Sequence, residues 1–451
     1  MKKRLGLLAL AAVLSSNAYS ASIDHIQTYT PEYLGNQAQN GMINNASVYY
    51  NPAGLVHLQN GTYFHAGIEL AVGEEKMNYN GQELKADLLQ PIPNFAMYKV
   101  EDDSALFWTF GGIAGGGDLK YKDGVPGTAV ISDIVNNSPL SDLLGEKITT
   151  EKSSAEGKNI YAQTTLGKTW KVDDKLSLSV AGRVVYGVRK LKGDIQVDGS
   201  SVLNQHKENR ATLDSERTAW GYGAQFGVNY KATERLNLAM RYDSRVKMNF
   251  KAKGSYNNVV ISEILDLGFG NFYPEYMPGT KTRRDLPAIL AAGMSYKVTD
   301  NWTVALSGNY YFNKDAKMDR IKQESILGSK VVEAEYDNGW ELAVGTEYRL
   351  SSKWAVLGSI NYADTGAKVS SYDDVEYALN SVTLGTGLKY NPDETTEWVF
   401  TVAHFFYDSE EGHYTEKYAK LNEKLPANMR INNPTYDKSI TAFGVSYTKR
   451  F

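Results

Sequence analysis

The chain has 451 residues and a formal net charge of −4, with 31 tyrosines, 40 glycines and no cysteine. A nucleic-acid partner is not expected, because nucleic-acid-binding surfaces are strongly basic. The lack of cysteine excludes disulfides, thiolate metal sites and a cysteine nucleophile. The polar mean hydropathy of −0.40, combined with 12% aromatic residues, is typical of strands that alternate apolar and polar side chains.

The N-terminus has the features of a secretory signal peptide. Residues 2–4 are basic, residues 5–14 form a short apolar core, and Ala-Tyr-Ser at 18–20 supplies the small residues that a signal peptidase needs. The apolar core is shorter than the roughly 20 residues of a membrane-spanning helix. We expect residues 1–20 to be removed by cleavage before Ala21. The remaining chain has no run of about 18 apolar residues, so it is either secreted and soluble or a membrane barrel.

From Gly61 onward, segments of about ten residues alternate apolar and polar side chains. In residues 220–230, Trp, Tyr, Ala, Phe, Val and Tyr occupy one face, while Gly, Gln and Asn occupy the other. One face therefore suits lipid and the other suits water. The pattern predicts fourteen strands, near residues 61–73, 93–101, 104–115, 158–171, 175–190, 217–231, 235–250, 285–298, 301–313, 338–350, 353–364, 379–391, 396–408 and 438–451.

The connections between these segments alternate between short and long, and the longest lie near residues 118–157 and 251–284. Bacterial outer-membrane barrels place short turns in the periplasm and long loops outside the cell. A soluble β-sandwich has no reason to separate its loops by length in this way. We therefore expect residues 61–451 to form an all-β, 14-stranded antiparallel transmembrane barrel in the bacterial outer membrane, working as a monomer.

The last segment ends in Phe451, with Phe443, Val445 and Tyr447 in the same register and Lys449 interrupting it. A terminal aromatic residue on an amphipathic last strand resembles the signal that the bacterial barrel-assembly machinery reads. We expect this machinery to be a partner of the chain.

Residues 21–60 have no strand period and are too few to fold alone. A barrel of fourteen strands is too wide for its own side chains to fill, so this segment is expected to sit inside as a plug. Residues 45–55, Asn-Ala-Ser-Val-Tyr-Tyr-Asn-Pro-Ala-Gly-Leu, resemble the hatch of the FadL family of outer-membrane transporters for long-chain fatty acids and aromatic hydrocarbons. Its core is Asn51, Pro52, Ala53, Gly54 and Leu55. The pentapeptide alone also suits a turn, but its position just before the first strand favours a hatch.

The resemblance implies passive uptake of hydrophobic compounds, above all long-chain fatty acids, with sideways release through a gap at a kinked third strand. The third predicted strand carries five glycines in seven residues: Gly111, Gly112, Gly115, Gly116 and Gly117. Glycine in a strand marks bulges and close backbone approach. The alternative interpretation is a flexible strand end that leads into a long loop.

Two long loops carry apolar residues that a solvated loop does not need, and such patches usually mark binding sites. The first, residues 129–144, has a spacing that suits short amphipathic helices. The second is residues 259–273. In the family, two outward loops with helices form the first hydrophobic groove; the alternative is that the loops pack together and cap the barrel. The candidate groove residues are Ile131, Ile134, Val135, Leu143, Leu144, Ile264, Leu265, Phe269 and Phe272.

Strand parity points four arginines into the lumen: Arg183, Arg189, Arg241 and Arg245. A fatty-acid carboxylate needs a cation where water is scarce, so they are candidate contacts. The alternative is ordinary lumen charge, paired with acids such as Asp243 and Glu341.

No catalytic or cofactor motif is present: the sequence has no His-Glu-x-x-His, no His-x-Ser and no phosphate-binding Gly-Lys loop. We expect no enzyme activity, no cofactor and no metal. Two other functions remain open, namely a general aqueous porin and a surface adhesin or receptor that binds through its long loops.

Overall fold

The computed structural model describes residues 26–136, 147–198, 210–262, 265–267, 273–325, 328–333, 335–372, 374, 376–423, 427 and 430–451. The expected signal peptide, residues 1–20, lies outside them. Within this part of the chain, no helix is both long enough and apolar enough to cross a membrane.

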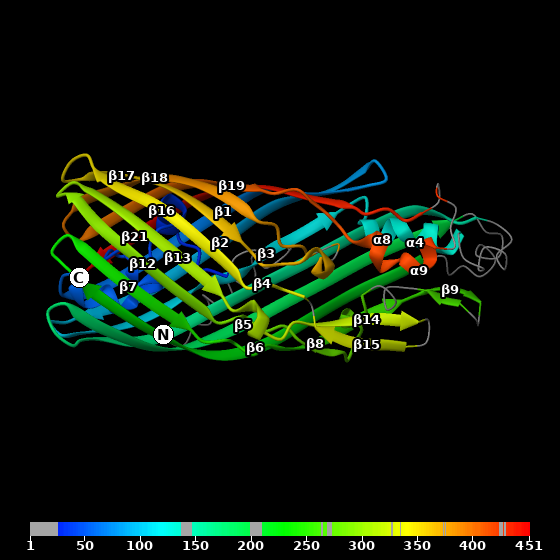
Figure 1. Cartoon of the computed structure of the whole chain (residues 1–451), viewed down its shortest axis with the longest axis horizontal. Coiled ribbons are helices and arrows are strands. Elements are labelled where there is room, and N and C mark those ends of the chain that lie inside the picture. Colours follow the sequence, from blue (N-terminus) through cyan, green and yellow to red (C-terminus); the bar gives the residue numbers. More distant parts are fainter. Residues whose placement is uncertain are drawn as a thin grey trace.

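Fourteen antiparallel wall strands close into a barrel, as predicted (Figure 1). The first six are β1 (Gly61–Tyr79), β2 (Gln82–Val100), β3 (Ser104–Tyr121), β4 (Thr149–Lys171), β5 (Leu176–Asp198) and β6 (Arg210–Lys231). The seventh is β7 (Leu236–Asp243) continued by β8 (Asn249–Asn257), and the eighth is β11 (Lys281–Arg283) continued by β12 (Ile289–Thr299). The last six are β13 (Trp302–Tyr311), β16 (Gly339–Arg349), β17 (Trp354–Asp364), β18 (Ser381–Asp393), β19 (Thr396–Tyr407) and β21 (Thr435–Arg450). The ring closes because β1 pairs with both β2 and β21.

The remaining elements lie before the barrel or in its connections. Before β1 come α2 (Pro31–Gly35), α3 (Ser47–Tyr50) and the 3-10 helix η1 (Pro52–His57). The connections contain α4 (Pro126–Asn136), β9 (Val259–Ser262), β10 (Leu265–Leu267), η2 (Pro274–Tyr276), η3 (Asn313–Asp315), β14 (Asp319–Ser325), β15 (Gly328–Glu333), η4 (Val369–Ser371), β20 (Glu410–Glu411), α8 (Tyr414–Lys417) and α9 (Ala419–Asn422).

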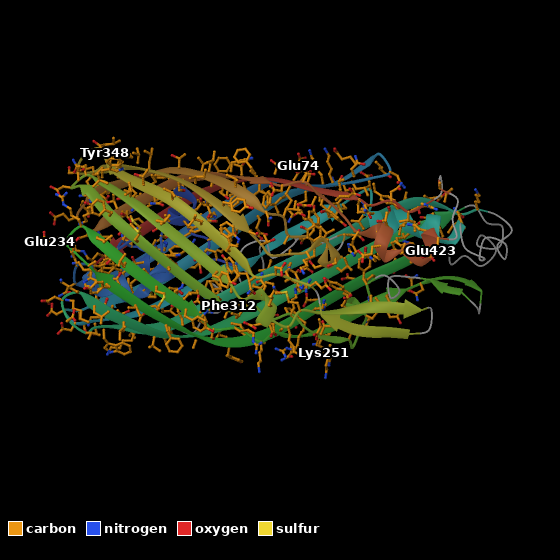
Figure 2. All side chains as sticks on the ribbon, viewed as in Figure 1. Glu74, Glu234, Lys251, Phe312, Tyr348 and Glu423 are labelled. Atoms are coloured by element: carbon orange, nitrogen blue, oxygen red, sulfur yellow. The ribbon has the colours of Figure 1, made fainter. Side chains whose placement is uncertain are left out.

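The two faces of the wall follow the alternation in the sequence. On β6, the side chains of Tyr222 and Phe226 are 71% and 49% exposed, whereas Gln225 and Asn229 between and after them are buried. Figure 2 shows such outward side chains around the barrel, with Tyr348 at the end that carries the short turns. Apolar groups outside and polar groups inside are the arrangement that a bilayer imposes on a barrel.

The strands on one side of the barrel extend well beyond the predicted segments. Instead of a long loop between residues 73 and 93, β1 and β2 continue into a hairpin whose turn is Asn80-Gly81. Both turn residues have positive φ, 50° and 81°, which is the geometry of a type I′ turn. The prediction of a long connection there was wrong, although the Asn-Gly dipeptide is itself a strong hairpin signal.

Residues 26–60 lie inside the barrel near the end with the short turns, where Figure 1 draws them in dark blue. Every residue from Pro31 to Met42 is buried, and so is every residue from Ala46 to Val56. The burial of this N-terminal segment is consistent with the expectation that it lies within the space that fourteen strands enclose.

Candidate functional site

The ladder between β2 and β3 ends partway along the barrel, at the Asn94–Gly111 pair. Beyond it, β2 stays paired with β1 as far as Gln82, and β3 stays paired with β4 as far as Tyr121. The two strands therefore separate from one another while each keeps its other neighbour. This leaves a gap in the wall between residues 82–93 of β2 and residues 112–121 of β3, which we call the β2–β3 gap.

The glycines of β3 lie where that strand leaves the regular ladder. Its pairing with β4 shifts between Gly112 and Ala114 and again between Ala114 and Gly117. Gly115 and Gly117 have φ values of 107° and 92°, a region that other residues rarely adopt. A bulged strand bends and twists more strongly, which turns the end of β3 away from β2.

The opposite edge of the gap carries two prolines, which the sequence analysis did not single out. Pro91 and Pro93 of β2 pair in unbroken register with Leu70 and Ile68 of β1. Proline has no N–H to give, so it fits a sheet only where that position faces away from a partner strand. The prolines therefore suit an edge that β3 does not cover, and a Pro-Ile-Pro run within an alternating segment was the available signal.

A cavity of about 80 Å³ lies behind the gap. Gly115 and Gly116 line it on the β3 side, Gln90 and Ile92 on the β2 side, and Tyr29 of the N-terminal segment on the inner side. A second cavity of about 50 Å³ lies between Pro91, Pro93 and the glycines. The interior of the barrel thus meets the gap at a space lined mainly by apolar groups.

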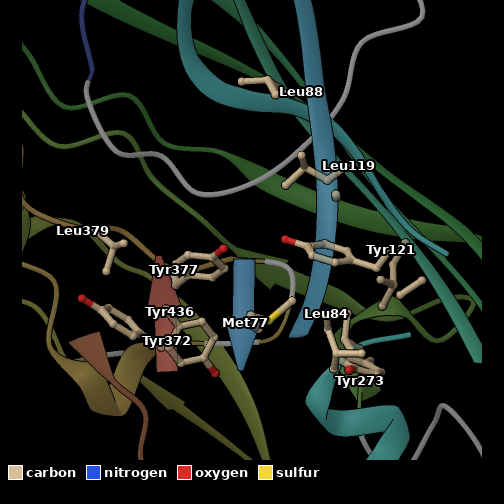
Figure 3. Close-up of a cluster of buried hydrophobic side chains, with 14 of the residues drawn as sticks. Met77, Leu84, Leu88, Leu119, Tyr121, Tyr273, Tyr372, Tyr377, Leu379 and Tyr436 are labelled. Atoms are coloured by element: carbon tan, nitrogen blue, oxygen red, sulfur yellow. The ribbon is translucent and has the colours of Figure 1, made fainter. Parts of the chain in front are cut away.

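Between this cavity and the outward loops lies a buried apolar cluster, which we call the upper-lumen cluster. It includes Met77, Tyr121, Tyr372, Tyr377 and Tyr436. Figure 3 shows tyrosines from separate loops and strands gathered beside Met77. The ring centroids of Tyr377 and Tyr436 are 4.5 Å apart, and those of Tyr372 and Tyr436 are 5.6 Å apart. The same cluster includes Leu34, Ala71, Leu88, Phe405 and Ala442, which line the cavity behind the gap. Apolar contact is therefore continuous from the loops down to the gap.

The N-terminal segment is fixed to the wall through its backbone carbonyls. Arg241 donates to the carbonyls of Tyr49 and Tyr50 at 2.7 and 2.9 Å. The hydroxyls of Thr169 and Ser177 donate to the carbonyls of Pro52 and Ala53 at 2.7 and 2.6 Å. These bonds satisfy irregular backbone that would otherwise be buried without partners.

In the Asn51–Leu55 motif, Asn51 lies between α3 and η1, and Pro52 to Leu55 form the first part of η1. The Asn51 amide donates to Asn229 of β6 at 2.7 Å and to the Met42 carbonyl at 3.2 Å. A Cβ on Gly54 would lie 2.8 Å from the Asn51 side chain, and Leu55 is fully buried. The motif thus combines a wall contact, a tight turn and an apolar anchor.

A family model described as "outer membrane protein transport protein (OMPP1/FadL/TodX)" matches residues 11–451. The chain belongs to this family. It is 21% identical over 441 residues to outer membrane protein P1 of Haemophilus influenzae, covering 87% of the chain and 88% of that protein. It is 24% identical to a 47 kDa outer membrane protein of Pasteurella multocida, over 48% of the chain and 50% of that protein. The chain is therefore an outer-membrane protein.

Solved structures share the fold of this FadL/TodX-family chain. The toluene transporter TodX of Pseudomonas putida superposes with a TM-score of 0.65 at 15% identity, over 94% of this chain and 99% of that one. A Pseudomonas aeruginosa FadL homologue gives a TM-score of 0.65 at 12% identity, over 95% and 100%. The recognised resemblance is thereby confirmed at the level of family and fold.

In this family member, three of the four predicted lumen arginines are buried and already hydrogen-bonded to protein groups. Arg183 donates to the side chain of Gln163 at 2.9 Å. Arg241, which also holds the N-terminal segment, lies 3.3 Å from the Asp243 carboxylate. Arg245 differs, because β7 ends at Asp243 and the expected alternation breaks there. Its side chain is 37% exposed, lies 3.8 Å from the Asp285 carboxylate and donates to the Asp315 carbonyl, so Arg245 differs from the other three in its burial.

Arg189 belongs to a second buried cluster, built around an acid that the sequence analysis missed. Glu376 accepts from Arg189 with one oxygen and from Arg284 with the other, the latter at 2.7 Å. Arg217 lies nearby with its guanidinium 5.0 Å from the centre of the Tyr276 ring. Glu376 comes from the long connection between β17 and β18, so nothing in the local sequence pattern reveals that it pairs with strand arginines.

The structure describes the backbone of only some of the nine expected groove residues. Ile131, Ile134 and Val135 lie on α4, so the helix expected in the first loop is present. The structure does not describe the side chains of these three residues. The residues Leu143, Leu144, Ile264, Phe269 and Phe272 lie outside the described residues. Leu265 begins β10, which pairs with β9 in a hairpin. At the described residues of the second loop, 259–262 and 265–267, the chain forms two short strands and not the helix that the resemblance implied; Val-Val-Ile at 259–261 favours strand structure.

The described loops do pack together, which supports the capping interpretation. Val130 of α4 is buried with Tyr79, Tyr414 and Ile431. Tyr414 is buried, and its burial raises the pKa of its hydroxyl well above the usual range. The nearby Asp374 carboxylate raises this pKa further. The loops therefore enclose the upper-lumen cluster from outside.

Proposed function

We propose that the protein is a passive channel for hydrophobic compounds, most of all long-chain fatty acids, and that it performs no catalysis. The observation that carries this proposal is the β2–β3 gap beside an apolar cavity. In the proposed path, a ligand is captured by the outward loops, moves along the upper-lumen cluster, and leaves sideways through the gap into the membrane. The N-terminal segment acts as a hatch that closes the direct route to the periplasm.

The sideways exit follows from the free energy of hydration. A hydrophobic ligand released into the periplasm exposes its surface to water, at about 25 cal/mol for each Å². Release through the wall keeps that surface in an apolar medium. An open strand edge in hydrocarbon is costly, because its backbone groups lack partners. Pro91 and Pro93 reduce that cost at the β2 edge, because proline has no backbone N–H that would need a hydrogen-bond partner.

The exit can be tested by closing the gap with a reversible cross-link. The chain has no cysteine, so Ile92→Cys with Gly112→Cys introduces a unique pair. A Cβ on Gly112 lies 3.1 Å from Ile92 Cγ2, which places the new sulfurs within bonding reach. We expect oxidation to slow uptake of a labelled fatty acid by cells or proteoliposomes, and reduction to restore it.

The matched control is Ala96→Cys with Thr109→Cys, a cross-strand pair in the closed part of the same ladder. Oxidation there should leave uptake unchanged. Uptake that continues at the same rate in the oxidised Ile92/Gly112 variant would remove the sideways exit from the proposal.

Two other functions are less well supported. A general aqueous porin needs an open lumen, whereas the burial of residues 31–42 and 46–56 supports a closed hatch. Swelling of liposomes in sugar solutions would favour the porin. A role as adhesin or receptor would use the outward loops and is compatible with transport. Structures of similar fold include a toluene transporter and a FadL homologue, so uptake should be compared between a fatty acid and an aromatic hydrocarbon.

We further propose that the chain works as a monomer and that its last strand is read during assembly. Phe451 is 78% exposed, and its amide donates to Thr62 of β1 at 2.8 Å. A Phe451→Ala variant should insert poorly into the outer membrane and still fold in detergent. Normal insertion of this variant would argue against recognition of the terminal aromatic ring.

A further inference from the structure

The cavity behind the β2–β3 gap contains one acidic side chain, Glu69 of β1. Glu69 is 1% exposed, and neither of its carboxyl oxygens has a hydrogen-bond partner among the described residues. A buried polar group without a partner is rare, because its desolvation is not compensated. The group therefore calls for an explanation beyond folding.

The neighbours of Glu69 on the inner face of the wall supply no side-chain donor. Along β1 these neighbours are Gly67 and Ala71, and across the ladders Glu69 pairs with Ile92 and Gly444. Below it, the N-terminal segment approaches so closely that a Cβ on Gly444 would lie 2.9 Å from Pro31. Glu69 is thus held on the strand beside glycine, alanine and isoleucine. The Tyr50 hydroxyl interacts with it electrostatically but donates its hydrogen to the Thr28 carbonyl, and Tyr29 and Tyr407 line the same cavity.

Other polar groups near this level are engaged elsewhere. His65 contacts Thr448 at 2.9 Å and Asn94 at 3.1 Å. The Gln90 amide, which shares the cavity, donates to the Pro91 carbonyl at 2.6 Å. The carboxyl of Glu32 accepts from Ser446 and acts electrostatically on Glu69. The ionisable side chain that lines the cavity is therefore an acid, and no arginine or lysine is among the lining residues.

We propose that Glu69 binds the polar head of the transported compound at the exit and selects heads that donate a hydrogen bond, such as an alcohol or a phenol. This inference rests on the proposed function, since it assumes that ligands reach the gap. A hydroxyl gives the Glu69 oxygens the donor that the protein lacks, while the apolar tail lies against Ile92 and the glycines. An anionic carboxylate meets two acidic groups instead, so a fatty acid passes this point as the protonated acid.

The test compares two neutral isomers, decanol and methyl nonyl ether, which differ in the presence of a donor. Uptake of each labelled compound is measured in proteoliposomes with wild-type protein, Glu69→Leu and Glu69→Gln. We expect the wild type to favour decanol by about tenfold, the effect of one hydrogen bond to a carboxyl group. Glu69→Leu should abolish this preference, whereas Glu69→Gln should keep part of it because the amide oxygen still accepts.

The control is Glu74→Gln, on the same strand, whose carboxylate is partly exposed and pairs with Lys76 at 2.7 Å. It should match the wild type. A second measurement is infrared difference spectroscopy: decanol should shift the carboxyl band of Glu69, which is identified by its loss in Glu69→Gln. Equal wild-type uptake of both isomers without such a shift overturns the role of Glu69 and leaves the channel intact. Failure to carry either isomer overturns the proposed function itself.

Discussion

Gly115 of β3 lies so close to Asn159 of β4 that a Cβ on the glycine would be 2.1 Å from the Asn159 carbonyl oxygen. This contact occurs where the β3–β4 register shifts and where the φ of Gly115 is 107°. The bend of β3 therefore depends on the absence of a side chain at this position.

A Gly115→Ala variant should consequently lose about 1–3 kcal/mol of stability, the cost of strained backbone at one residue. Uptake through the gap should fall as well, because β3 can relieve the strain only by changing its bend. Gly182→Ala in β5 is the matched control, since a Cβ there meets nothing within 4 Å. Urea unfolding in detergent measures both variants, and equal midpoints would contradict this account of the bend.

A second prediction concerns whether the hatch must leave the barrel. The side chains of Asn51 and Asn229 are hydrogen-bonded at 2.7 Å, so Asn51→Cys with Asn229→Cys can be joined by oxidation or a short thiol-specific cross-linker. If ligands leave sideways, the cross-linked protein should transport at the wild-type rate. Transport that stops on cross-linking and returns on reduction would mean that the segment moves aside.

A third prediction concerns the buried Glu376, which holds Arg189 and Arg284. Glu376→Gln leaves two buried guanidinium groups without their counter-charge, so it should destabilise the folded barrel by about 3–5 kcal/mol. Glu335→Gln serves as control because Glu335 is exposed in a neighbouring loop. The measurement is again the urea midpoint, and similar midpoints for the two variants would show that Glu376 carries little of the stability.

A fourth prediction concerns pH. Burial, and then the positive charges of Lys231 and Lys171, lower the pKa of His57 in the hatch from 6.5 to about 4. The folded state thus favours the neutral imidazole, and its contribution to stability is complete above pH 6.5. As pH falls from 6.5 to about 4, the unfolded chain takes up the proton first and that contribution is lost. Wild-type protein should therefore lose more stability than His57→Gln between pH 7.5 and pH 4.5, as measured by thermal unfolding; parallel losses would contradict it.

Much of the architecture follows from the sequence, because a bilayer imposes a strict pattern on a barrel. Residues such as Tyr222 and Gln225 had to face lipid and lumen respectively, since a strand places successive side chains on opposite faces. The same alternation indicated the strand number, and the Asn51–Leu55 motif indicated the family. These features depend on neighbours in the chain, which a sequence displays directly.

Other features depend on contacts between residues far apart in the chain, and only the tertiary structure decides them. Glu376 lies 187 positions from Arg189, and the alternation could not show that Arg245 falls past the end of β7. The isolation of Glu69 has the same origin, because it results from Ile92 and Gly444 on adjacent strands. The sequence determined which face of the wall each side chain occupies, whereas the closure of the barrel determined what each one meets inside, since strand pairing and the buried N-terminal segment set those neighbours.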